Sequence, residues 1–232
     1  MILLLAGVLT TAAFASSPEE VAESAMEGYR LFMRDSLPDD RQKGYDMMLS
    51  AAWEGDAKAA NNIGWLLQHG EYVERDDAAA LRWYERAAVQ GLPAAALNWI
   101  EMMESEPESL GGILPDTSVL ADAAYLAGSA LSMGRGLHYG PRKGELLLLK
   151  AALWGDDKAA ITVAQQLEMY PDSFSYLPLE EIASSANALL PPEKRLEVTP
   201  DLTDRLLTPE FWYARMDTQK EKEPGSMNFR TP

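Results

Sequence analysis

The chain contains no cysteine. This excludes disulfide bonds, a lipid anchor attached to cysteine and every thiolate metal site, so the fold must be stable through its packed core alone. Histidine is scarce as well, since His69 and His138 are the only two. Neither has a second histidine at the spacing of a helical zinc motif, and a solvated turn residue is the more common role. We therefore expect no metal and no cofactor.

Basic residues are also few. Lys and Arg total 20 against 36 Asp and Glu, which gives a formal net charge of -16. Such a surface repels nucleic-acid phosphates and anionic lipid headgroups, so both are disfavoured as partners. It would favour a basic partner protein, although simple solvation explains most surface acid.

Long hydrophobic runs are missing apart from Ile2 to Ala13, which is too short to span a bilayer as a helix. Ala13 and Ala15 place small residues where a signal peptidase cleaves, so residues 1–15 are predicted to be a secretory signal peptide. No Lys or Arg precedes the run, and a buried first helix is the alternative. If the signal is removed, we expect a periplasmic protein without membrane insertion.

The chain does contain an internal repeat. The decapeptide AAWEGDAKAA at 51–60 recurs as AALWGDDKAA at 151–160. Gly91 matches Gly55 at an offset of 36 residues, and Gly155 follows Gly91 after a further 64. A recurrence of this kind is typical of stacked supersecondary units.

Each unit is predicted to be a pair of helices. The first helix begins after Asp56, whose carboxylate can cap the first turn, and Gly70 can end it in the left-handed conformation. The second helix is predicted to be capped by Asp76 or Asp77 and to end at Gly91. The predicted buried residues recur at three- and four-residue spacing. They are Ala59, Ala60, Ile63, Gly64 and Leu67 in the first helix and Ala80, Leu81, Tyr84, Ala87 and Ala88 in the second.

Residues 56–99 resemble a Sel1-like repeat, a relative of the tetratricopeptide repeat. The resemblance rests on the central Ile63-Gly64 of an Ala-rich first helix, the turn containing Gly70, and the Trp-Tyr-x-x-Ala-Ala-x-x-Gly pattern from Trp83 to Gly91. It implies an all-α fold, a right-handed α-solenoid of helix-turn-helix repeats over residues 18–170. The positions that carry the repeat are Gly55, Gly64, Gly70, Trp83, Tyr84, Ala87, Ala88, Gly91, Gly128, Gly134 and Gly155.

Two regions depart from the repeat. Residues 104–117, rich in Glu, Pro and Gly, predict a loop in place of one second helix, so we expect the solenoid to bend or break there. Residues 171–217 are predicted to form a C-terminal helical cap, in which Phe211-Trp212-Tyr213 lies on a short helix or a strand-like arm and covers the open end. The polar residues 218–232 are predicted to be a disordered tail.

Catalytic patterns are not found in the sequence. Asp76-Asp77 and Asp156-Asp157 stand at predicted helix starts, where capping explains them better than acid–base chemistry. Gly134-Arg135-Gly136 follows a predicted helix and overlays the turn of the repeat, unlike a phosphate-binding loop. Some secreted Sel1-like proteins carry cysteine pairs and a β-lactamase-type activity is associated with them, but this chain has no cysteine. We therefore predict no catalytic residue.

The first helices of such a solenoid line a concave groove. Asn62 and Asn98 occupy the same repeat position, with Trp65 and Glu101 three residues further on, and these four are the predicted partner-binding residues. Asparagine can bind a peptide backbone through a donor and an acceptor, and an exposed Trp can anchor an interface. The alternative is that the asparagines bond to an adjacent turn and that Trp65 packs between helices.

The resemblance implies a non-enzymatic protein–protein interaction module in the bacterial periplasm. Exported Sel1-like proteins include immunity proteins that block secreted lipase-type toxins, so a toxin is one expected partner. The alternatives are a structural adaptor that binds an envelope enzyme, and a cell-wall or β-lactam-active hydrolase. The sequence leaves the oligomeric state open.

Overall fold

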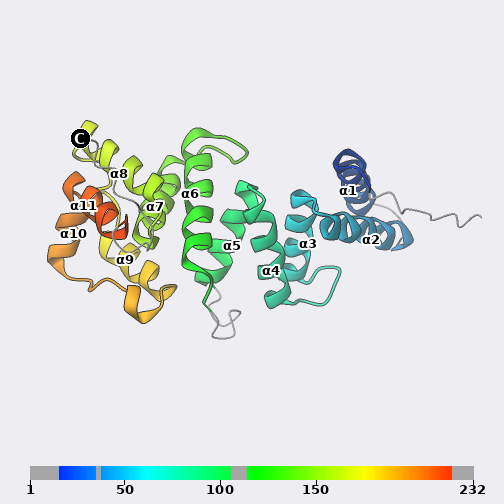
Figure 1. Cartoon of the computed structure of the whole chain (residues 1–232). Coiled ribbons are helices and arrows are strands. Elements are labelled where there is room, and N and C mark those ends of the chain that lie inside the picture. Colours follow the sequence, from blue (N-terminus) through cyan, green and yellow to red (C-terminus); the bar gives the residue numbers. More distant parts are fainter. Residues whose placement is uncertain (1–15, 35–37, 106–113, 221–232) are drawn as a thin grey trace, which may run out of the picture.

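The computed structural model describes residues 16–34, 38–105 and 114–220. Every regular element within these ranges is helical, so the predicted all-α fold is confirmed. Figure 1 shows the helices following one another along one long axis, with α1 and α2 at one end and α10 and α11 at the other. The elements are α1 (Pro18–Met33), α2 (Pro38–Glu54), α3 (Ala57–His69), α4 (Asp77–Val89), α5 (Pro93–Ser105), α6 (Thr117–Met133), α7 (Pro141–Trp154), α8 (Asp157–Met169), α9 (Leu179–Ala188), the 3-10 helix η2 (Pro192–Lys194), α10 (Pro200–Leu206) and α11 (Pro209–Lys220).

Two of the helix pairs cross at a pair of glycines. Gly28 of α1 lies against Gly44 of α2, and a Cβ atom on Gly44 would stand 2.5 Å from the Gly28 carbonyl oxygen. Gly128 of α6 and Gly144 of α7 form the same crossing, where a Cβ atom on Gly128 would stand 2.9 Å from the Gly144 carbonyl oxygen. The missing side chains let the two backbones touch. Of these four glycines, the sequence analysis singled out only Gly128.

The pair α3–α4 uses a single glycine. Gly64 of α3 faces Tyr84 of α4, whose ring atoms would lie 2.9 and 3.0 Å from an added Cβ atom. Tyr84 is fully buried, and its hydroxyl donates a hydrogen bond to Oε1 of Gln68 at 2.8 Å. Burial raises the pKa of the Tyr84 phenol well above its ordinary value. The tyrosine ring therefore fills the space that the glycine leaves.

The two decapeptides form the same joint between a second helix and the next first helix. Gly55 and Gly155 follow α2 and α7 with φ angles of 107° and 103°, a conformation that glycine adopts without steric cost. Asp56 and Asp156 then cap α3 and α8. Each carboxylate accepts a hydrogen bond, 2.6 Å long, from the amide three residues later. Each aspartate thereby satisfies a backbone donor that the first helical turn leaves free.

The turns within the helix pairs follow the predicted punctuation. Gly70 ends α3 and Gly134 ends α6, both in the left-handed conformation, with φ angles of 67° and 65°. Of the two aspartates predicted as caps of α4, Asp76 accepts the capping hydrogen bond from the backbone amide of the third following residue at 2.8 Å. Asp77 instead pairs with Arg75 at 2.7 Å.

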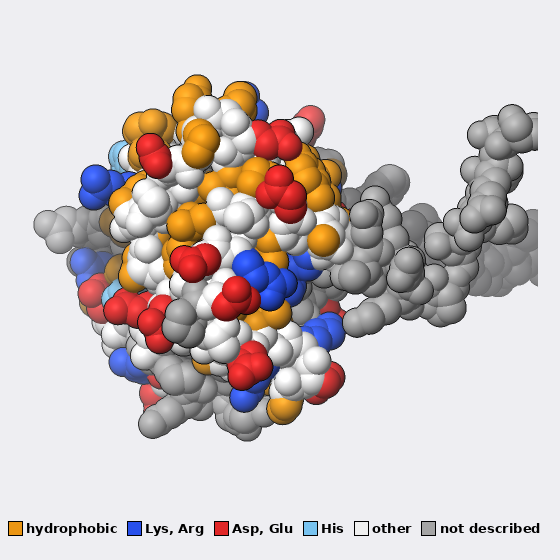
Figure 2. Space-filling view, turned by 90° about the vertical axis from the view of Figure 1, so that its left-hand side faces the viewer, with side chains coloured by type: hydrophobic (Ala, Val, Ile, Leu, Met, Phe, Trp, Pro, Cys, Tyr) orange, Lys and Arg blue, Asp and Glu red, His pale blue; other side chains and the backbone are white. Residues whose placement is uncertain are grey.

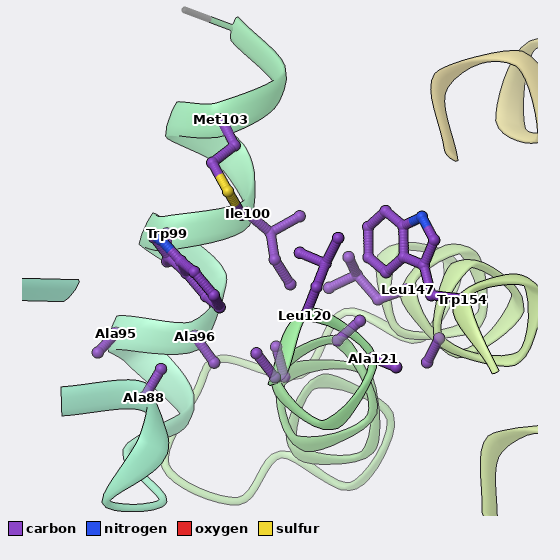
Figure 3. Close-up of a cluster of buried hydrophobic side chains, with 14 of the residues drawn as sticks. Ala88, Ala95, Ala96, Trp99, Ile100, Met103, Leu120, Ala121, Leu147 and Trp154 are labelled. Atoms are coloured by element: carbon purple, nitrogen blue, oxygen red, sulfur yellow. The ribbon is translucent and has the colours of Figure 1, made fainter. Parts of the chain in front are cut away.

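The core continues through the irregular interval. Figure 3 shows Ile100 of α5, Leu120 of α6 and Leu147 of α7 gathered in one cluster of buried side chains. Of the two expected outcomes, a bend or a break, the break is wrong, because α6 packs directly against α5 and takes up its apolar face. A bend at this interval stays a prediction. Residues 106–113 of the predicted loop lie outside the described residues.

A buried lysine connects the two sides of this interval. Lys150 of α7 is 4% exposed, and its Nζ donates to the carboxylate of Glu104 at the end of α5. A buried ammonium group is costly unless a carboxylate compensates it. The pair therefore favours the placement of α7 beside α5.

The C-terminal helices close the other end of the molecule. α11 packs against α8, and Trp212 is fully buried with its Nε1 donating to the Leu206 carbonyl oxygen at 3.0 Å. Arg215 donates to the Leu153 carbonyl oxygen of α7 at 2.7 Å. The segment around Trp212 is thus a helix and not a strand-like arm. Figure 2 views this end and shows hydrophobic side chains lying among separate acidic and basic ones.

The boundary of the C-terminal cap lies slightly later than predicted. α11 continues to Lys220, so the first three residues of the predicted tail, 218–220, are helical. Gln219 and Lys220 have good helix propensity, which explains the extension. Residues 221–232 lie outside the described residues.

The N-terminal helix begins with a capping box. Ser17 Oγ accepts a hydrogen bond from the Glu20 amide at 3.2 Å, and Glu20 Oε2 accepts one from the Ser17 amide at 2.7 Å. The predicted signal peptide, residues 1–15, lies outside the described residues. Among the helices of the described ranges, none has the length and apolar character to cross a membrane.

Candidate functional site

A groove runs between the first helices α1 and α3. Its larger part, about 540 Å³, lies among α1, the start of α3 and the turn from α4 to α5. A second part, about 290 Å³, continues toward the C-terminal ends of α1 and α3. Both parts are lined by Tyr29, Asn61 and Asn62, so they form one channel, the α1–α3 groove.

The walls of the α1–α3 groove are apolar and exposed. Met26, Tyr29 and Met33 of α1 are 62%, 45% and 62% exposed, and Trp65 of α3 is 40% exposed. Single exposed apolar residues are ordinary, but a contiguous set that lines one channel indicates a contact surface. With Ala22, the α1 residues form a helical stripe that the sequence analysis missed, although the spacing is visible in the sequence.

Trp65 is held at the groove by His69. The two rings stack with 4.2 Å between their centroids and 24° between their planes. His69 Nδ1 also lies 2.9 Å from the Trp65 carbonyl oxygen. The stack restricts the rotamer of Trp65, and the exposed fraction of its side chain shows that it does not pack between helices.

The two predicted asparagines have different surroundings. Asn98 Nδ2 donates to Asn61 Oδ1 at 3.0 Å, which connects α5 to α3. Asn62 lines the groove, and its side chain makes no hydrogen bond to any of the described residues. Its amide therefore remains able to bind a partner as donor and as acceptor.

The repeat register explains why the interval between α1 and α3 stays open. Positions 62 and 98 are equivalent, and so are positions 25 and 61, because each pair is 36 residues apart. Asn61 of α3 accepts a hydrogen bond from Asn98 of α5. The equivalent position of α1 is Ala25, whose methyl group cannot accept a hydrogen bond from Asn62. Asn62 thus lacks the side-chain bond that joins α5 to α3.

Glu101 lies outside the α1–α3 groove. Its carboxylate pairs with Lys143 at the start of α7. Both side chains are about half exposed, so the pair contributes little to stability. The structure brings Asn62 and Trp65 together in the groove, whereas Asn98 and Glu101 serve the contacts of α5 with α3 and α7.

The described residues offer no arrangement typical of a metal centre. No group of three or more His, Asp or Glu residues in these ranges could hold a metal ion. Burial raises the pKa of Asp156, and the neighbouring Asp122 raises it further, while the hydrogen bond from the Ala159 amide acts in the opposite direction. That carboxylate caps α8, so its perturbed titration belongs to the fold.

A second exposed tryptophan lies on the second helices. Trp53 of α2 is 63% exposed and meets Trp83 of α4 edge to face, with 4.7 Å between ring centroids. Arg86 lies over both rings and donates to the Trp53 carbonyl oxygen at 2.8 Å. This cluster ties α2 to α4, so its aromatic and cationic groups already have partners.

Comparison with known proteins finds solved structures of low similarity to this chain. No family model matches the chain, and no curated protein matches it by sequence. The chain is similar to a crystal structure of a protective antigen of uropathogenic Escherichia coli that displays an SLR fold, with 19% identity and a TM-score of 0.39. That match covers 88% of this chain and 49% of the other, so the chain spans about half the length of the Escherichia coli protein.

A Sel1 repeat protein from Oxalobacter formigenes is similar as well, with 18% identity and a TM-score of 0.37. The match covers 93% of this chain and 91% of that protein. The helix pair α3–α4 contains the residues on which the resemblance to a Sel1-like repeat rests. Gly64 lies at the contact between α3 and α4, and Gly70 lies in the turn that joins them. Tyr84 lies on the buried face of α4, and Gly91 lies in the turn that follows α4.

Proposed function

We propose that this protein binds a segment of another protein in the α1–α3 groove. The observation that carries the proposal is the channel itself, which Met26, Tyr29, Met33 and Trp65 line with exposed apolar surface. Asn62 adds a free amide that can bond to a partner. An apolar anchor surface with a few polar groups is the usual composition of a binding centre.

Photo-cross-linking tests this proposal. A benzophenone amino acid replaces Met26 in the groove or, as a matched control, Met133 at the end of α6, which is 60% exposed. We expect position 26 to cross-link one defined cellular protein and position 133 not to. Affinity of the purified pair should then fall about tenfold or more in Trp65→Ala, as expected for an interface anchor. Equal cross-linking from both positions would refute the groove as the site.

A narrower form of the proposal makes the protein an exported inhibitor, of the immunity type, whose partner is a secreted lipase-type toxin. The apolar run Ile2 to Ala13, the lack of cysteine and the net charge of -16 support it. Cell fractionation and the mass of the mature N-terminus test the export. Stoichiometric inhibition of a co-purifying lipase separates an inhibitor from an adaptor, because an adaptor binds its envelope enzyme without blocking it.

The proposal also holds that the protein itself is not a hydrolase. Purified protein should leave β-lactam and cell-wall substrates intact. Hydrolysis by the purified protein would overturn this part. If that hydrolysis persisted when Met26, Tyr29 and Trp65 are all replaced by alanine, the activity would be independent of the groove.

A further inference from the structure

We propose that the segment bound in the α1–α3 groove is an amphipathic helix of about three turns, with basic side chains on the flank that faces α1. This inference rests on the proposed function and adds the conformation and the charge of the ligand. Three features of the groove lead to it: its direction, the apolar side chains of its α1 wall, and the distribution of charge beside it.

The groove extends along α1 and α3, and at one end it reaches the α4–α5 turn. The α1 stripe from Ala22 to Met33 spans twelve residues, and its first and last Cα atoms are about 16 Å apart at the helical rise. Toward α5 the path is obstructed, because Asn98 and Asn61 are hydrogen-bonded between α5 and α3. An occupant therefore lies beside α1 and α3, where a third helix of about three turns has a matching length.

The walls favour a ligand that satisfies its own backbone. An extended segment would bring unpaired amide and carbonyl groups against Met26, Tyr29 and Met33, and each buried unpaired group is costly. Asn61 is already bonded to Asn98. The other polar lining residues, Asp56, Lys58 and Gln90, line only the part of the groove near the α4–α5 turn, so beside Tyr29 and Met33 an extended segment would find only the side chain of Asn62 to bond. A helix closes its hydrogen bonds internally and presents apolar side chains to the walls. Asn62 then has one polar side chain of the ligand to bond.

The charge beside the groove favours a basic flank. Glu19 and Glu23 are exposed, and at 100° per residue they lie next to the apolar stripe on the side away from α2. Arg30 on the same side is paired with Glu27, and the cationic Lys58 lines the opposite wall, on α3. The net charge of -16 attracts a cationic ligand and disfavours a second copy of the chain as occupant.

Synthetic peptides of about fifteen residues, long enough to form a helix, provide the probes. One probe is an amphipathic helix with lysines on one flank, a second has glutamates in their place, and a third has the lysine composition with two central prolines. Binding is measured by fluorescence anisotropy on the full chain. Methyl NMR of labelled methionines identifies the site, with Met26 and Met33 in the groove and Met133 and Met169 as controls far from it.

We expect the lysine helix to bind about tenfold more tightly than the glutamate helix and to shift the methyl signals of Met26 and Met33. Glu19→Gln combined with Glu23→Gln should narrow the difference between the two affinities without changing the melting temperature. Ser24→Ala with Ser50→Ala is the matched control, because both serines are outside the groove.

Several results would overturn the inference. If the proline probe bound as tightly as the lysine helix, the ligand would be extended. Equal binding of the lysine and glutamate helices would refute the basic flank. Groove methyl shifts that grow with protein concentration alone would indicate a second copy of the chain as the occupant. Failure of every probe would also overturn it. The proposed function fails separately, when position 26 cross-links no partner.

Discussion

Replacing Gly128 with alanine should destabilise the solenoid more than the same replacement at Gly64, although the two glycines occupy the same repeat position. At Gly128 the new methyl group would lie 2.9 Å from the Gly144 carbonyl oxygen and 3.0 Å from the Leu148 amide nitrogen, both backbone atoms of α7. At Gly64 the nearest atoms belong to the Tyr84 ring, and the nearest backbone atom is 3.3 Å away. A ring can tilt by a few tenths of an ångström, whereas α7 moves only if two helices part.

The sizes of the opposing effects set the expected difference. Alanine gains about 1 kcal/mol over glycine in helix propensity. Overpacking a buried contact costs about 1–3 kcal/mol. At Gly64 the two effects nearly balance, with a net loss of about 0–1 kcal/mol. At Gly128 the backbone contact puts the cost at the upper end, so the net loss is about 2 kcal/mol, or about 4–8 °C in melting temperature for a chain of this size.

Thermal unfolding followed by far-UV circular dichroism, together with the urea midpoint at constant m value, measures both variants. Ser129→Ala serves as the control, because it adds no atom beside the Gly128–Gly144 crossing. If Gly128→Ala were as stable as Gly64→Ala, or more stable than the native protein, the rigidity assigned to the α6–α7 crossing would be refuted.

Three further perturbations test the fold. Burial raises the pKa of Asp156, so the contribution of this carboxyl group to stability falls as the pH rises from about 4 through the raised pKa. Asp156→Asn keeps the capping oxygen and should therefore raise the melting temperature more at about pH 7 than at about pH 3. An equal change at both pH values would contradict this. Trp212→Ala should cost about 3–5 kcal/mol and speed hydrogen exchange in α8, whereas unchanged exchange would show that α11 does not protect that helix. Glu104→Ala leaves Lys150 buried without its carboxylate and should lower the free energy of unfolding by about 1–3 kcal/mol. In a double-mutant cycle, adding Lys150→Met should recover this loss. If it does not, the two side chains are not coupled.

Much of the fold could be predicted because its signals are local. Asp56 caps α3, Gly70 ends it, and Tyr84 is buried in α4, as the spacing indicates. Each of these features depends on a few neighbouring residues, through the free amides of a first turn, the left-handed conformation of glycine or the helical period of an apolar stripe. The break predicted near residues 104–117 was wrong, because the loop composition of that segment does not reveal that α6 packs directly against α5.

The candidate site depended on contacts between distant segments. The sequence by itself determined the helices, their joints and the equivalence of Asn62 with Asn98. Only the tertiary structure decided that Asn98 bonds to Asn61, that Glu101 pairs with Lys143, and that Asn62 remains free. The physical reason is that equal positions in a repeat meet unequal neighbours: Ala25 stands where Asn61 would be needed, so the groove beside α1 stays open.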